Sequence, residues 1–294
     1  PLLCNLINAG LIATLAHRLI GARAAPLALL LFLGMPFILE YGSSSESYQA
    51  FAMSAGLTGY LLYLKFLASQ RLRTLTMALA CFALGMGFTW LAGFMALVVL
   101  AHYWLLSGSL SAKVRATLLA GVILGATALV LLAQQGLATG DFLYPFKRAL
   151  ERSHAPPGSV ITWAEITKLQ ASRYWGYFGP VITALTLYWL ARRALPRRNW
   201  REMDTWAVLI WTPGLVYGFL LRDVAHQHEF LMLGLAPGAA LMATQGLLQL
   251  IEDVSNMAGQ RHGPRLMWLA LSLLLALHFL GAVRSARNFE AQEA

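Results

Sequence analysis

Charged residues are scarce in this chain. Asp, Glu, Lys and Arg together make up 12% of the 294 residues, whereas hydrophobic residues make up 58%. A soluble domain carries about 25% charged residues, so half that share cannot cover a water-facing surface of this size. The composition therefore excludes the soluble globular, disordered, collagen-like and disulfide-scaffold classes, and it predicts a polytopic membrane protein.

Several chemical signatures are also missing. The two cysteines, Cys4 and Cys81, both lie in apolar runs and indicate nothing about the redox compartment. The sequence contains no Walker A motif, no zinc-protease helix motif and no Gly-x-Ser-x-Gly elbow. It begins at Pro1 directly in apolar sequence, without the charged start of a signal peptide. We interpret residues 1–294 as a single transmembrane domain that lacks its N-terminal spans.

Apolar segments long enough to cross a bilayer recur along the whole chain. A span needs roughly 20 mostly apolar residues, and about ten segments, some of them short, approach this. They are 2–17, 24–41, 47–68, 74–89, 91–107, 116–134, 174–191, 204–221, 229–251 and 266–283. Gly85, Gly87 and Gly93 mark a break, so 74–89 and 91–107 could instead form a re-entrant hairpin. The predicted fold is an all-α transmembrane bundle of about ten spans.

The formal net charge of +9 favours an orientation rather than a nucleic-acid partner. Lys and Arg collect in cytoplasmic loops of membrane proteins. If the first span ends in the cytoplasm, fourteen of the 22 basic residues are cytoplasmic: Arg18, Arg23, Lys65, Arg71, Arg73, Lys113, Arg115, Arg192, Arg193, Arg197, Arg198, Arg201, Arg261 and Arg265. Nine of the 13 acids then lie outside: Glu40, Glu46, Asp141, Glu151, Glu165, Asp223, Glu229, Glu290 and Glu293. We therefore expect the chemistry on the extracytoplasmic face.

Three outer segments carry candidate site residues. In 40–48, Glu46 stands at the mouth of the third span, where it could either begin the helix or coordinate a metal or orient a hydroxyl. In 222–230, two histidines, two acids and an arginine exceed what a turn needs; they could ligate a metal, bind a phosphate or shuttle a proton. The third segment is the extracytoplasmic loop 135–173, in which we expect short interfacial helices. There Tyr144 stands beside Lys147 and Arg148, either as an interfacial anchor or as a phosphate-binding stretch.

Other conspicuous residues have structural explanations. His102 and His278 lie inside apolar spans near aromatic residues, which favours buried hydrogen bonding over ligation. Glycines at 85, 87, 93, 121 and 125 allow helices to approach closely.

The order of these segments resembles the GT-C superfamily of membrane glycosyltransferases, which includes protein O-mannosyltransferases and aminoarabinose transferases. The stretches that carry the resemblance are 5–41 with its basic turn and Met35-Pro36, 43–65 with Glu46, the glycine-rich 84–100, and His226-Gln227-His228-Glu229-Phe230 with Pro237. The aromatic residue usual after the histidine of that superfamily is replaced here by Gln227 or Glu229, and its acidic first outer loop would precede Pro1.

The resemblance implies a function and a site. A sugar on a polyprenyl phosphate would be transferred, with inversion, to a lipid, glycan or protein acceptor at the extracytoplasmic face of a bacterial inner membrane. Catalysis would fall to Glu46, His226, His228 and Glu229. Donor binding would fall to Arg222, Asp223, Lys147, Arg148 and Tyr144, and a divalent metal such as Mg or Mn could assist.

Two other functions compete with this interpretation. The altered histidine–aromatic pattern favours a non-catalytic subunit that packs with membrane protein partners in a larger complex. A lipid or solute transporter would need ionisable residues within several spans, and the span interiors offer only His102 and His278. The sequence thus favours the enzyme or the subunit over the transporter.

Overall fold

The computed structural model describes residues 2–41, 48–106, 108–144, 147, 162–194, 202–220 and 233–293. Within these ranges the chain is helical and contains no strand, which confirms the all-α prediction. The chain divides into two compact units. Unit 1 comprises Pro1–Ser47, Ala171–Trp211 and Leu235–Ala294, and unit 2 comprises Tyr48–Gln170 and Thr212–Gly234.

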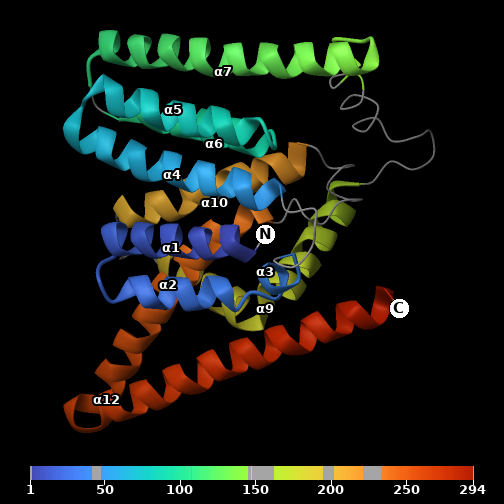
Figure 1. Ribbon diagram of the computed structural model, residues 1–294. Coiled ribbons are helices and arrows are strands. Elements are labelled where there is room, and N and C mark those ends of the chain that lie inside the picture. Colours follow the sequence, from blue (N-terminus) through green and yellow to red (C-terminus); the bar gives the residue numbers. More distant parts are fainter. Residues whose placement is uncertain are drawn as a thin grey trace. The chain divides into compact units, whose positions relative to one another are not determined.

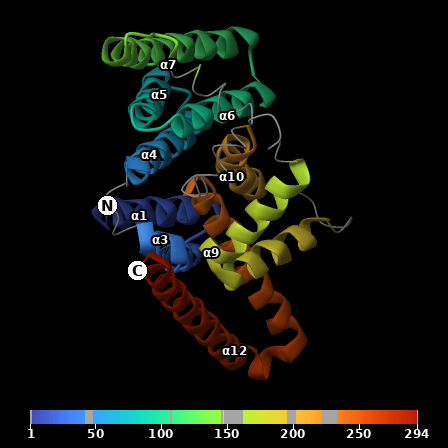
Figure 2. The same ribbon diagram turned by 90° about the vertical axis from the view of Figure 1, so that its right-hand side faces the viewer.

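Unit 2 contains four consecutive helices: α4 (Tyr48–Ser69), α5 (Leu72–Met86), α6 (Leu91–Leu105) and α7 (Leu110–Thr139). Each packs against a neighbour, and α5 lies against α4, α6 and α7 (Figures 1 and 2). Glycine permits the closest approaches, since a Cβ on Gly59 would meet the ring of Phe82. A Cβ on Gly85 would lie 2.7 Å from Cβ of Ala92, so the predicted role of Gly85 in close helix packing is confirmed. The same prediction is wrong for Gly121 and Gly125, where a Cβ would meet no atom within 4 Å.

Unit 1 contains α1 (Leu2–Leu19), α2 (Ala24–Leu33), α3 (Pro36–Tyr41), most of α9 (Trp163–Ala194), the first part of α10 (Glu202–Leu220) and α12 (Ala236–Glu293). Figure 1 shows the ribbon of α12 changing direction along its length. In α9, Gly179 has a φ of 83°, and Pro180 follows it. Because proline has no N–H to continue the ladder and glycine tolerates this φ, α9 is broken there into two helices.

A second break in unit 1 separates α2 from α3. Gly34 ends α2 and Pro36 begins α3, which fits the preference of proline for the first turn of a helix. The predicted span 24–41 is therefore two short helices. At this break His278 lies against Gly34, and its Nε2–H donates to the carbonyl oxygen of Leu31 at 3.0 Å. The expectation that His278 is a buried hydrogen-bonding residue is confirmed.

Among the described residues, four helical segments are long and apolar enough to cross a membrane: Leu2–Leu19, Tyr48–Ser69, Leu110–Thr139 and Leu233–Met257. This is compatible with an integral membrane protein. The count of ten spans is not confirmed, because α5 and α6 have 15 residues each. Fifteen residues rise about 22 Å, short of a hydrocarbon core of about 30 Å.

Candidate functional site

The structure describes two of the predicted site residues, Tyr144 and Lys147, both in the segment that follows α7. Glu46, Arg148, Arg222, Asp223, His226, His228 and Glu229 lie outside the described residues. The catalytic set therefore stays a prediction. The segment after α7 is the part of the candidate site whose geometry can be followed, and we call Thr139–Tyr144 together with Lys147 the α7 turn.

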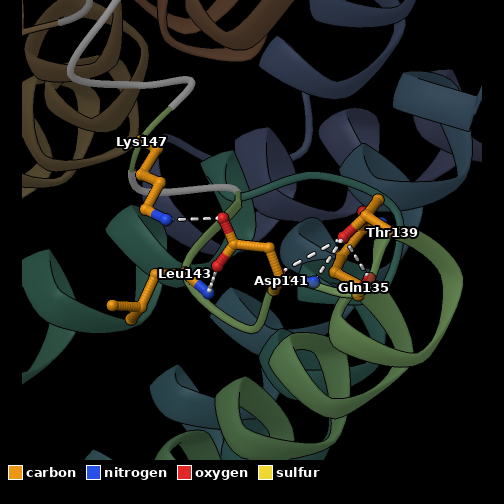
Figure 3. Close-up of polar contacts among 5 residues, drawn as sticks. All are labelled: Gln135, Thr139, Asp141, Leu143 and Lys147. Atoms are coloured by element: carbon orange, nitrogen blue, oxygen red, sulfur yellow. Dashed lines mark hydrogen bonds and ion pairs between the residues drawn. The ribbon is translucent and has the colours of Figure 1, made fainter.

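The α7 turn begins with a helix end that glycine makes possible. Gly140 has a φ of 73° and its N–H donates to the carbonyl oxygen of Gly136 at 2.8 Å, which is a left-handed helix cap. The chain then reverses direction, and a Cβ on Gly136 would overlap the ring of Phe142. Thr139 Oγ1 donates to the carbonyl of Gln135 at 2.7 Å and accepts the N–H of Asp141 at 3.3 Å (Figure 3). The turn is thus tied to the last turn of α7.

Asp141 uses its two carboxylate oxygens for different purposes. Oδ1 accepts the backbone N–H of Leu143 at 2.9 Å, and Oδ2 accepts from Lys147 Nζ at 2.7 Å (Figure 3). The first bond is an Asx turn, which shapes the backbone locally. The second holds the ammonium group of Lys147, whose side chain remains 60% exposed. Since an ammonium has three N–H donors, Lys147 can bind an oxyanion while Asp141 holds it in place.

The hydrogen bond from Lys147, followed by that from the Leu143 backbone, lowers the pKa of the Asp141 carboxyl from its ordinary value. A depressed pKa means that the carboxylate stabilises the turn at pH values above its unfolded pKa, and that this contribution disappears as the pH falls through the lower folded value. We expect the contact between Asp141 and Lys147 to persist as the pH falls to the ordinary aspartate pKa, and to be lost only below it. Carboxyl ¹³C chemical shifts of labelled Asp141 measure this, and a midpoint above the ordinary aspartate value would contradict it.

Unit 1 contains a buried polar cluster that was not predicted from the sequence. The indole N–H of Trp189 is shared between Asp204 Oδ1 at 3.2 Å and Gln245 Oε1 at 2.7 Å. Arg193 Nε lies 2.9 Å from the same Asp204 oxygen, and the Arg193 and Asp204 side chains are 3% and 0% exposed. Helices α9, α10 and α12 each contribute to this cluster, so it fixes three helices to one another.

A second ion pair extends the cluster along α12. Arg192 Nη2 lies 2.7 Å from Asp253 Oδ1, and the hydroxyl of Tyr188 donates to Asp253 Oδ2. The Arg192 and Asp253 side chains are 26% and 24% exposed. The sequence gives one indication of these pairs. Asp204 and Asp253 lie at or just beyond the ends of predicted spans, and Arg192 and Arg193 directly follow the predicted span 174–191. This cluster supplies structural charge pairing and no group poised for a reaction.

His102 in unit 2 makes the predicted hydrogen bond, although its side chain is half-buried rather than buried. Its Nδ1 lies 2.9 Å from the hydroxyl of Tyr63, and the two rings meet edge to face. The described residues contain no group of three or more His, Cys, Asp or Glu that could hold a metal ion. The carboxylates and imidazoles proposed for a metal all lie outside those residues, so the divalent metal stays a prediction.

Comparison with known protein families, curated proteins and solved structures finds no match for this chain. The resemblance to the GT-C superfamily therefore rests on the motifs in the sequence. What the structure adds is local: it describes one predicted donor-binding cation, Lys147, and the contacts that orient it.

Proposed function

We propose that this chain is a membrane glycosyltransferase that moves a sugar from a polyprenyl-phosphate donor to an acceptor hydroxyl on the extracytoplasmic face. The observation that carries the proposal is the exposed ammonium of Lys147, which Asp141 holds at 2.7 Å just beyond the end of α7. An ammonium beside an apolar helix suits a ligand that is part hydrocarbon and part phosphate. The order of motifs in the sequence supports the same conclusion.

The proposed reaction is a single displacement with inversion. A carboxylate takes the proton of the acceptor hydroxyl while the hydroxyl oxygen attacks the anomeric carbon of the sugar. The bond from this carbon to the phosphate oxygen breaks, and its electron pair leaves with the lipid phosphate. Cations close to that oxygen stabilise the developing charge, and Lys147 is the one whose geometry is described.

The other site residues keep the roles that the resemblance implies. The catalytic roles of Glu46, His226, His228 and Glu229, which include deprotonation of the acceptor, follow from the resemblance alone. Arg222, Asp223, Arg148 and Tyr144 would bind the donor together with Lys147.

A radiolabelled polyprenyl-phosphate-sugar transfer assay in native membranes tests the proposal. Because a hydrogen bond to a charged group contributes about 1.5–3 kcal/mol, we expect Lys147→Met to lower kcat/KM roughly 10- to 100-fold. Lys113→Met is the matched control, since Lys113 lies at the start of α7, where its Nζ donates to the carbonyl of Trp104. Glu46→Gln and His226→Ala should each reduce turnover.

Two results would contradict the proposal. Equal kcat/KM for the Lys147→Met and Lys113→Met variants would remove Lys147 from the donor site. A wild-type chain that transfers no sugar from any polyprenyl-phosphate donor would favour the non-catalytic subunit instead.

A further inference from the structure

An apolar groove runs between α5 and α7 in unit 2. Its volume is about 500 Å³, within the range of ligand sites. The lining residues are Ala83 and Leu84 of α5, Gly87 and Phe88 directly after its end, and Ala126, Thr127, Val130, Leu131 and Gln134 of α7. None of them is charged. Figures 1 and 2 show α5 and α7 side by side.

The walls of the groove are held in place by contacts within unit 2. The ring of Phe88 stacks on Phe51, with centroids 5.7 Å apart. Thr127 Oγ1 donates to the carbonyl of Ile123 at 2.8 Å, so its hydroxyl is already paired within α7. Hydrocarbon can therefore enter without leaving the Thr127 hydroxyl unpaired.

The surroundings of the groove indicate what fills it. In the most apolar 18-residue stretch of α7, only 11% of the residues are buried within the chain. The groove is itself open, since its lining residue Val130 is 57% exposed, and Val122 and Leu129 on the same helix are 69% and 68% exposed. A helix of this kind faces lipid. An empty groove would lose dispersion contacts on its apolar lining. Because lipid hydrocarbon surrounds an exposed transmembrane helix, a lipid chain is the ligand most available to fill the groove.

The length of the groove distinguishes between kinds of lipid chain. From Ala126 to Gln134 it extends eight residues along α7, about 12 Å. One leaflet of a bilayer contributes about 15 Å of hydrocarbon. Ala126 lies near the middle of α7, and Gln134 lies toward its C-terminal end. The groove therefore matches an acyl chain confined to one leaflet, and a polyprenyl chain would extend well beyond it.

We infer that this groove binds one acyl chain of a membrane phospholipid, with the exposed amide of Gln134 at the polar end beside the glycerol esters. The lipid is a resident component that fills the space between α5 and α7. None of the lining residues belongs to the α7 turn, and the inference does not depend on the proposed function.

Lipid retention tests the inference. The protein is reconstituted in nanodiscs of phosphatidylethanolamine and phosphatidylcholine, released into mild detergent and examined by native mass spectrometry. We expect the wild type to keep one phospholipid and Val130→Trp, which fills the groove, to keep at least about fivefold less. Val122→Trp is the matched control, because Val122 is an exposed valine of the same helix outside the groove, and it should retain lipid like the wild type. Equal retention by all three proteins, or a polyprenyl phosphate in place of the phospholipid, overturns the inference.

A cross-linking measurement on the unaltered chain keeps the test valid even if Val130→Trp folds poorly. A phospholipid with a diazirine in the middle of one acyl chain is irradiated with the wild-type protein in the same nanodiscs, and modified peptides are sequenced. Labels should concentrate on residues 83–88 and 126–134. Labels spread evenly along the exposed face of α7 would show ordinary bilayer contact and would overturn the inference.

Discussion

Replacement of Asp204 by asparagine is expected to lower the free energy of unfolding by about 3–5 kcal/mol. The substitution removes the countercharge of Arg193, whose side chain is only 3% exposed. It also weakens the hydrogen bond that Asp204 accepts from Trp189 at 3.2 Å. The guanidinium then stays buried without a partner of opposite charge, which costs far more than the pair contributes when intact. Denaturation of the purified protein in detergent micelles, followed by circular dichroism, measures the change.

A double substitution separates lost charge pairing from lost packing. Arg193→Met with Asp204→Leu replaces both charges by apolar side chains, and removal of a whole buried pair is often neutral. We therefore expect the double variant to be more stable than Asp204→Asn alone. Asp253→Asn should cost less than Asp204→Asn, because the Arg192–Asp253 pair is about one quarter exposed and water screens it. An Asp204→Asn variant as stable as the wild type would show that Arg193 finds another partner.

The positions of most helices followed from hydrophobicity alone. Segments 2–17 and 47–68 were predicted as spans, and helices occupy Leu2–Leu19 and Tyr48–Ser69. An apolar run indicates which residues are shielded from water, but it does not indicate where the helix within that run is interrupted. For this reason 24–41 was predicted as one span, although Gly34 and Pro36 divide it.

The polar contacts were harder to predict because they join residues distant in sequence. Trp189 and Gln245 are 56 positions apart, and Arg192 and Asp253 are 61 apart. No periodicity within one helix indicates such a partner. Lys147 was identified as a candidate phosphate-binding residue because it lies beside aromatics, yet its anchor Asp141 was grouped only with the outer acids. The pairing depends on the reversal at Gly140, which places Asp141 and Lys147 in one turn.

Gly246 of α12 is the position where we expect the second large effect on stability. A Cβ at Gly246 would overlap the carbonyl oxygen of Leu185 in α9 and lie 3.4 Å from Cβ of Trp189. A backbone carbonyl cannot rotate away as a side chain can, so α9 and α12 would have to separate. Separation would also strain the bond between Trp189 and Gln245, which is 2.7 Å long. We expect Gly246→Ala to lower the free energy of unfolding by about 1–3 kcal/mol.

Gly176 provides the matched control within the same unit. It lies in the first helix of α9, and a Cβ there would meet no atom within 4 Å. Because alanine is favoured over glycine inside a helix by about 0.5–1 kcal/mol, Gly176→Ala should leave stability unchanged or raise it. Each alanine variant adds one methyl group to the wild type. The difference between their melting temperatures therefore measures the cost of the contact with the Leu185 carbonyl at Gly246. If Gly246→Ala melts at or above the temperature of Gly176→Ala, the close approach of α9 and α12 at Gly246 is wrong. If Gly246→Ala melts at a lower temperature and the Trp189 indole N–H resonance also shifts, the loss of stability comes from separation of α9 and α12. Neither glycine nor alanine has a polar side chain, so the shift cannot come from a lost hydrogen bond of residue 246 itself.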